Sequence, residues 1–81
     1  MNAIAYKFIY VCTKAETHDS KPLYLVLNRK SNDELGVIFW YKAWRMWVLQ
    51  SRGDTVWSTD CLADVRDAIA KITAHYQQVL R

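Results

Sequence analysis

Basic and aromatic side chains alternate through the middle of the chain, and they form the constellation with the clearest chemical content. Guanidinium groups pair with phosphate or carboxylate, while indole and phenol rings stack on unpaired bases or fill apolar pockets on a protein surface. The residues concerned are Arg29, Lys30, Tyr41, Lys42, Trp44, Arg45, Trp47 and Arg52. The pattern indicates a binding surface, and single-stranded nucleic acid or another protein could occupy it.

Other residue types that could do chemistry lack the required spacing. His18 and His75 are far apart and have no metal-ligand companions in sequence. Asp64 and Asp67 lie on adjacent turns of an expected helix, but nothing apolar surrounds them that would raise a carboxyl pKa for acid–base work. We therefore expect no catalytic residues, no metal site and no cofactor, and the protein is not expected to be an enzyme.

Length and composition indicate one small globular domain, residues 1–81. Hydrophobic residues make up 52% of the 81 residues, aromatic residues 14%, and the net charge is +3. A chain of this length buries only about 60–65% of its unfolded surface, so the core must be thin. The sequence has neither an apolar run long enough for a membrane span nor a leader-like start. We expect a cytosolic protein in which Cys12 and Cys61 are reduced and mostly buried.

Residue alternation and turn-forming residues predict an antiparallel sheet of four to five strands. The expected strands span about 3–13, 23–27, 35–41, 44–50 and 55–57. A polar loop is expected at 14–21, a hairpin connection at 28–34, and a four-residue type I turn between the third and fourth strands. Gly36, just inside the third strand, marks either a bulge or the close approach of another backbone.

A helix is expected at about 59–79. Ser58 is the expected N-cap, with Asp60 as the rival cap. Apolar residues then recur at helical spacing and form one stripe, which must pack on one face of the sheet. The stripe consists of Leu62, Val65, Ile69, Ile72, Tyr76 and Val79. The fold class that follows is α+β, with one C-terminal helix packed on one face of the sheet.

One helix of about 20 residues is ~10 Å wide, whereas four or five strands make a sheet about 20 Å across. Both faces of that sheet are apolar in sequence, because Val37 and Phe39 alternate with Ile38 and Trp40. Apolar area left over usually marks an interaction site. The alternative is that strand curling, loops and the N-terminal segment bury the excess.

The segment 35–49 (Leu-Gly-Val-Ile-Phe-Trp-Tyr-Lys-Ala-Trp-Arg-Met-Trp-Val-Leu) is followed at 55–65 by Thr-Val-Trp-Ser-Thr-Asp-Cys-Leu-Ala-Asp-Val. This combination resembles a pattern in small uncharacterised proteins of bacteriophages and prophages, Gly-x-Ile/Val-x-Trp-Tyr-x-x-Trp-Arg, then Asp-Cys-Leu-x-Asp-Ile/Val. The resemblance covers about a third of the chain and carries no catalytic residues. It implies a phage-type accessory protein, a class that includes stoichiometric inhibitors of host defence such as anti-CRISPR proteins.

These observations together predict a non-enzymatic binding module that acts in the bacterial cytosol on a host protein or ribonucleoprotein complex, with a homodimer as a further form of association. The expected partner-binding residues are Trp40, Tyr41, Trp44, Arg45, Trp47 and Arg52, although some of these tryptophans must belong to the core. The alternative is a small basic nucleic-acid-binding accessory protein that uses the same positions.

Overall fold

The computed structural model describes residues 3–79, with side chains as far as Gln77, and shows the α+β fold that the sequence predicts. Five strands precede one C-terminal helix. The strands are β1 (Ala3–Ala5), β2 (Ile9–His18), β3 (Lys21–Asn28), β4 (Glu34–Tyr41) and β5 (Met46–Ser51), and the helix is α1 (Thr59–Val79).

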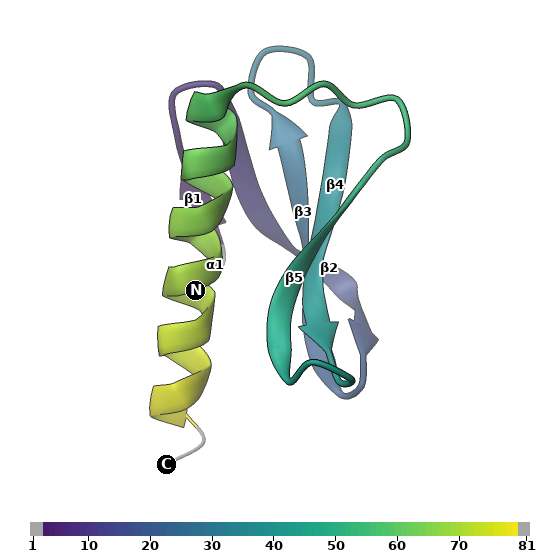
Figure 1. Cartoon of the computed structure of the whole chain (residues 1–81), viewed down its shortest axis with the longest axis vertical. Helices are drawn as coiled ribbons and strands as arrows, with labels where there is room; N and C mark the ends of the chain where they lie inside the picture. Colours follow the sequence, from purple (N-terminus) through teal and green to yellow (C-terminus); the bar gives the residue numbers. More distant parts are fainter. Residues whose placement is uncertain (1–2, 80–81) are drawn as a thin grey trace.

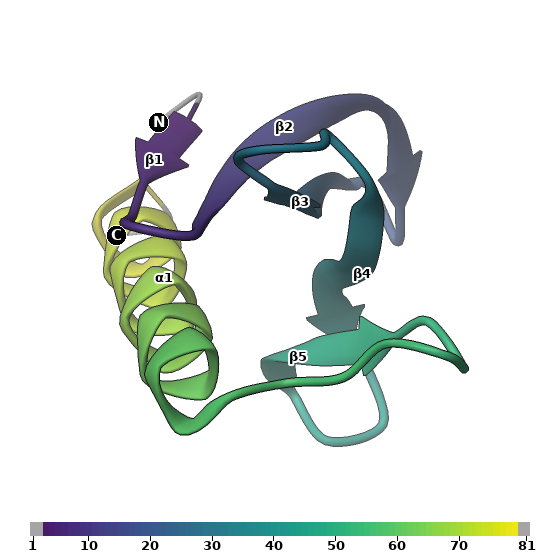
Figure 2. The ribbon, with the colours of Figure 1, turned by 90° about the horizontal axis from the view of Figure 1, so that it is seen from above.

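The strands form one antiparallel sheet in the order β1-β2-β3-β4-β5, so every neighbour in space is also a neighbour in sequence. Figure 1 shows the helix standing beside this sheet, and Figure 2 shows the sheet curling around it, with β1 and β5 at its two edges. The curl gives the sheet a concave face toward α1 and a convex face away from it.

The first predicted strand, 3–13, is wrong as a single element, because a tight turn divides it into β1 and β2. The amide N–H of Tyr6 donates to the carbonyl of Ile9 at 2.8 Å, and Ala5 then pairs with Tyr10 across the turn. Lys7 and Phe8 at the turn are exposed. The turn contains neither glycine nor proline, so the sequence carried no strong signal for it.

The polar loop predicted at 14–21 is also wrong, since β2 continues to His18 with a bulge between Lys14 and Thr17. The connection to β3 is only Asp19-Ser20, with φ values of 51° and 64°. Two left-handed residues are what a two-residue hairpin turn of type I′ requires, and aspartate tolerates that conformation better than most residues. Of the polar residues in this segment, Glu16, Thr17 and His18 are exposed residues of β2, and only Asp19 and Ser20 form the connection.

The connection between β3 and β4 lies within the predicted hairpin region. The carboxamide oxygen of Asn28 accepts hydrogen bonds from the amides of Lys30 and Ser31, and the amide of Asn28 donates to the carbonyl of Asp33 at 2.9 Å. In the following strand, a Cβ atom on Gly36 would lie 2.8 Å from the carbonyl oxygen of Gln50. The predicted close approach of another backbone is therefore confirmed.

Residues 42–45 form the turn between β4 and β5. The strand predicted to begin at Trp44 is β5, and it begins at Met46. The amide of Trp44 donates to the carbonyl of Tyr41, and Arg45 closes the turn with a φ of 53°. The expected four-residue turn is correct, and the left-handed residue at its end explains why the strand starts later than predicted.

The short strand predicted at 55–57 does not form. After the Arg52–Thr55 turn, the carbonyl of Leu35 accepts both the Arg52 amide and the Thr55 hydroxyl, and Val56 is 94% exposed. The segment therefore continues to α1 without joining the sheet. Ser58 is the N-cap as predicted, since its hydroxyl accepts the amide N–H of Cys61 at 3.1 Å.

The core lies between α1 and the concave face of the sheet. Its buried residues are Ile9, Val11, Tyr24, Val26, Ile38, Trp47, Val65, Ala68 and Ile72. Among the residues described, none of the buried side chains is polar or charged.

The predicted helix stripe is partly wrong. Leu62 is 50% exposed, and Cys61 and Ala68 face the core instead. The side chain of Val79 lies outside the described part. The helix face that contacts the sheet therefore includes Cys61 and Ala68 in place of Leu62, and it packs against β2 and β5.

Candidate functional site

The convex face of the sheet is apolar across four strands. Strand alternation sends Ile38 and Val26 to the core, so their sequence neighbours point outward. The strand register then aligns the outward residues in rows, such as Cys12, Leu25 and Val37. The convex face comprises Tyr10, Cys12, Leu23, Leu25, Leu27, Val37, Phe39, Tyr41, Met46 and Val48.

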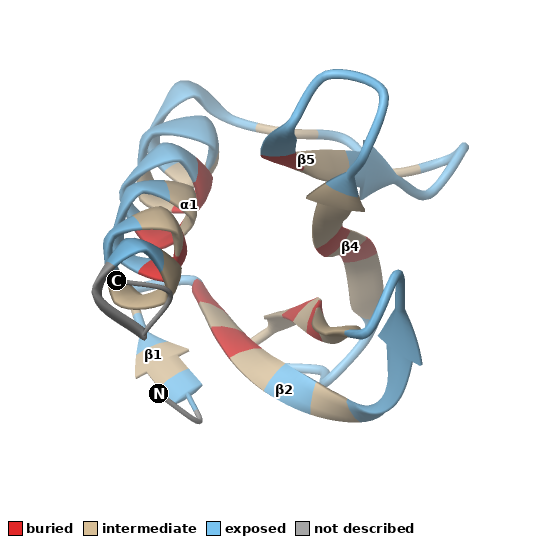
Figure 3. Ribbon diagram, turned by 90° about the horizontal axis from the view of Figure 1, so that it is seen from below, coloured by how far each residue is buried: buried red, intermediate tan, exposed pale blue. Residues whose placement is uncertain are grey.

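Within residues 3–79 no helix lies on the convex face, as Figures 2 and 3 show. Met46 is 51% exposed and Tyr41 is 37% exposed, while most of the other members are half-buried between neighbouring strands. Four strands ~4.8 Å apart and about six residues long project an area of roughly 400 Å². This size falls in the range of about 300–600 Å² typical of the largest apolar patch on a monomer, which is often functional.

Aromatic rings continue this face to the β4–β5 turn through a series of edge-to-face contacts. His18 lies 5.3 Å from Phe39 between ring centroids, Phe39 lies 6.3 Å from Tyr41, and Tyr41 lies 4.9 Å from Trp44. Trp44 is 65% exposed. These rings form a rigid aromatic edge, and their contacts restrict side-chain motion that binding would otherwise have to restrict.

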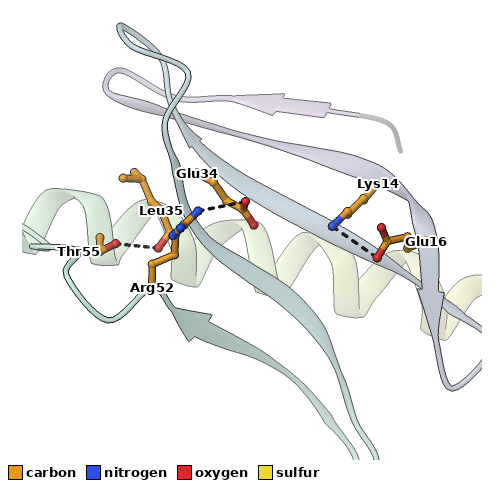
Figure 4. Close-up of polar contacts among 6 residues, drawn as sticks. All are labelled: Lys14, Glu16, Glu34, Leu35, Arg52 and Thr55. Carbon is orange, nitrogen blue, oxygen red and sulfur yellow. Dashed lines mark hydrogen bonds and ion pairs between the residues drawn. The ribbon is translucent and has the colours of Figure 1, made fainter.

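Charged residues at the border of the convex face are paired with opposite charges. Lys14 lies 3.5 Å from Glu16, and Arg52 lies 3.4 Å from Glu34. Figure 4 shows these two pairs on neighbouring parts of the sheet. His18 Nε2 lies 3.6 Å from Asp19 at the β2–β3 turn. These pairs place both signs of charge at the border of the convex face.

The structure divides the predicted partner-binding residues between the two sides of the sheet. Tyr41 and Trp44 lie at the convex face and its aromatic edge. Trp40 and Trp47 face the helix side, with their ring centroids 5.9 Å apart. Trp47 is only 4% exposed and contacts Tyr76 at 5.0 Å, so its prediction as a contact residue is wrong and it belongs to the core. Alternation along β4 places Trp40 and Tyr41 on opposite sides of the sheet, and Trp44 lies outside the strands, in the β4–β5 turn.

The two predicted arginines also lie apart. Arg52 follows β5 and pairs with Glu34, whereas Arg45 ends the turn at the opposite end of β5. Arg29, another member of the basic constellation, donates from Nη1 to the carbonyl of Tyr6 at 2.7 Å. Arg29 and Arg52 therefore lie apart from Arg45, which shares the β4–β5 turn with Lys42.

Four groups have pKa values shifted by their surroundings. Burial and the hydrogen bond with Tyr76 raise the pKa of Tyr24 in the core. Burial raises the pKa of the Cys12 thiol on the convex face, so the thiol stays protonated at neutral pH. Burial, together with the hydrogen bond to Asp67, raises the pKa of Tyr6. The same hydrogen bond, at 2.7 Å, and the ion pair with Lys71 lower the pKa of Asp67. The hydrogen bond between Tyr6 and Asp67 joins the β1–β2 turn to α1.

Sequence reasoning missed most of the convex face. It placed Val37 and Phe39 on one face and Ile38 and Trp40 on the other without indicating which face is outward, and it left out their partners on β2 and β3, including Leu23 and Leu25. The signal was present in the alternation of apolar residues in β3, which reads Leu-Tyr-Leu-Val-Leu and is apolar on both sides.

Neither a metal site nor a membrane span is found in the described part of the chain. Residues 3–79 contain no cluster of three or more histidine, cysteine or acidic side chains that could hold a metal ion. The described helix is not long and apolar enough to cross a membrane. Comparisons with protein families, with curated proteins and with solved structures find no match to this chain.

Proposed function

We propose that this protein works by binding another protein through the convex face, with the aromatic edge at Tyr41 and Trp44 as part of the contact. The observation that carries the proposal is an apolar surface across four strands that α1 leaves open to solvent. Burying such residues against a partner contributes roughly 25 cal/mol per Å² of apolar area. Rigid aromatic side chains at its edge are the residue types enriched at interface hot spots.

A protein partner fits this surface better than nucleic acid does. Nucleic-acid affinity depends on a concentration of unpaired lysine and arginine that displaces counterions from phosphates. Here Lys14 and Arg52 at the border are paired with carboxylates, and the middle of the face is uncharged. An apolar centre with a rim of both charge signs matches the usual anatomy of a protein interface.

The resemblance to phage and prophage proteins narrows the proposal to a class of partner. We infer a stoichiometric inhibitor that covers a surface on a bacterial host complex in the cytosol, with host defence as the process affected and an anti-CRISPR role as one form of it. Covering a surface requires no catalytic group, so the proposal assigns the protein no enzymatic activity. Cys12 and Cys61 are free thiols, which agrees with a reducing compartment.

The test is capture of partners from a bacterial lysate by the wild-type protein and by two charge variants of the convex face, Phe39→Lys and Val37→Lys. A lysine keeps an aliphatic stem against the sheet while its ammonium group opposes burial by a partner. Ala70→Lys, at an exposed position of α1, adds the same charge away from the face and serves as the control. Circular dichroism confirms that each variant is folded.

The expected result is one protein or complex recovered in a fixed ratio by wild type and Ala70→Lys and lost with both convex-face variants, with or without nuclease. Loss of every partner after nuclease treatment would instead support the nucleic-acid alternative. Light scattering of wild type and Phe39→Lys tests for a homodimer, and a wild-type dimer that becomes a monomer in Phe39→Lys would place a second copy on the convex face. Recovery of the same partner by all variants would refute the proposed surface.

A further inference from the structure

A cavity of about 370 Å³ lies between α1 and the end of the β4–β5 hairpin, on the opposite side of the sheet from the convex face. Its walls include Trp40, Trp47, Ile69 and Tyr76. The ring centroids of Trp47 and Tyr76 are 5.0 Å apart with an interplanar angle of 38°, and Trp40 lies 5.9 Å from Trp47 at 70°. Aromatic faces and edges thus surround a space within the size range of small-molecule sites, about 300–1,000 Å³.

Two cations are among the residues that line this cavity. The ammonium group of Lys21 lies 5.0 Å from the centroid of the Trp40 ring, and Arg45 lies at the end of the hairpin turn. No ion pair joins either cation to another residue of the described part, and no acidic side chain is among the lining residues described there. Both positive charges remain available to a ligand, in contrast to the paired charges around the convex face.

We propose that this cavity binds a small planar aromatic anion. The ring of such a ligand would contact Trp40, Met46 and Tyr76, against which the buried Trp47 packs, and its carboxylate, sulfonate or phosphate would pair with Lys21 and Arg45. Aromatic contacts provide apolar area with a preferred ring geometry, and the two cations select for negative charge. This inference does not depend on the proposed function, because it concerns the other side of the sheet.

The probe is 2-naphthoate, with 2-naphthalenemethanol as the neutral analogue of similar shape and acetate as the charge without the ring. Titration is followed by the indole N–H signals of the four tryptophans in nitrogen-15 NMR spectra. We expect saturable binding with a Kd on the order of 1 mM or tighter, from about 0.3 kcal/mol for each of the probe's heavy atoms. The Trp40 and Trp47 signals should shift, while that of Trp57, whose indole N–H is bonded to Ser51, should not.

The neutral analogue should bind about tenfold more weakly than 2-naphthoate, and acetate should produce no saturable shift. Lys21→Gln and Arg45→Gly should each weaken 2-naphthoate binding about three- to tenfold. Glycine suits the left-handed conformation of position 45, so loss of binding in that variant cannot be attributed to a disrupted turn. Lys30→Gln, in the β3–β4 loop, removes one charge elsewhere and should leave binding unchanged.

Equal affinity for 2-naphthalenemethanol and 2-naphthoate would show that Lys21 and Arg45 do not bind the anionic group of the ligand. Equal loss of affinity in Lys30→Gln would show that net charge alone is responsible. Shifts confined to the exposed Trp44, or no saturable binding of 2-naphthoate at all, would show that the cavity is not a ligand site. None of these outcomes bears on partner capture by the convex face.

Discussion

Gly36 determines how closely β4 and β5 approach, and its replacement by alanine tests the strand register that separates the two faces of the sheet. A Cβ atom at this position would lie 2.8 Å from the carbonyl oxygen of Gln50 and 3.0 Å from Cδ1 of Leu49. The first contact is with backbone, which cannot rotate away as a flexible side chain can. The two strands must therefore move apart where Val37 pairs with Gln50.

The expected cost of Gly36→Ala follows from two opposing effects. Forcing a methyl group into a packed site costs about 1–3 kcal/mol, whereas replacing glycine with alanine restricts the unfolded chain and returns about 0.4–1 kcal/mol. The net decrease in the free energy of unfolding should be about 1–2 kcal/mol. For a domain of this size each kcal/mol lowers the Tm by about 4–8 °C, so a decrease of about 4–16 °C is expected.

Urea and thermal unfolding followed by circular dichroism measure this effect, and Gly53→Ala is the matched control. Nothing lies within 4 Å of a Cβ atom at Gly53, and neither glycine has a positive φ. The control should be neutral or more stable than wild type by up to about 1 kcal/mol. If Gly36→Ala were as stable as Gly53→Ala, the strand separation, and with it the assignment of residues to the two faces, would be wrong.

Five further substitutions test how the rest of the fold is stabilised. Trp47→Ala should lower the free energy of unfolding, measured in urea, by about 3–5 kcal/mol because Trp47 is buried. Trp44→Ala should change it by less than about 0.5 kcal/mol because Trp44 is exposed. Similar effects of the two substitutions would contradict the assignment of Trp47 to the core and Trp44 to the surface. Ser58→Ala should cost about 1 kcal/mol and Ser58→Gly only a few tenths, because the hydroxyl caps α1; equal stability of Ser58→Ala and wild type would argue against the cap. Tyr6→Phe should cost about 0.5–1.5 kcal/mol at pH 7 by removing the hydrogen bond to Asp67. The folded-state pKa of Asp67 is lowered, so its contribution to stability is present at neutral pH and is lost as the pH falls below about 4. The difference in unfolding free energy between Tyr6→Phe and wild type should therefore shrink below that pH. A difference independent of pH would count against the hydrogen bond between Tyr6 and Asp67. The folded-state pKa of Tyr6 is raised, so wild-type stability should also fall above about pH 10, and this fall should be smaller in Tyr6→Phe.

The fold class could be predicted because its signals are local and strong. Alternation in β4 and β5, the Ser58 cap and the helical spacing from Val65 to Tyr76 each depend on residues close in sequence. The turns were harder to predict. Lys7-Phe8 and Asp19-Ser20 bend the chain without glycine or proline, so their positions follow from strand pairing across the sheet.

The candidate site could be predicted only in part, because the side of the sheet that α1 covers depends on contacts between residues distant in sequence. The sequence indicates that β3 and β4 are apolar on both sides, and this leads correctly to a surplus of apolar surface. It does not indicate which side α1 covers, because the helix approaches from beside β2 and β5 and is oriented by contacts distant in sequence. Trp47 and Trp44 therefore could not be separated into core and surface before the strand register was known.

The most direct test of the central claim is the dissociation constant of the purified partner for wild type, Phe39→Lys and Ala70→Lys, measured by calorimetry. A charge at the centre of a buried interface should raise the Kd by about 30-fold or more, equivalent to a hot-spot loss of at least about 2 kcal/mol, whereas Ala70→Lys should leave the Kd unchanged. A Kd for Phe39→Lys equal to that of wild type, with the variant folded, would contradict the claim that the convex face is the binding surface.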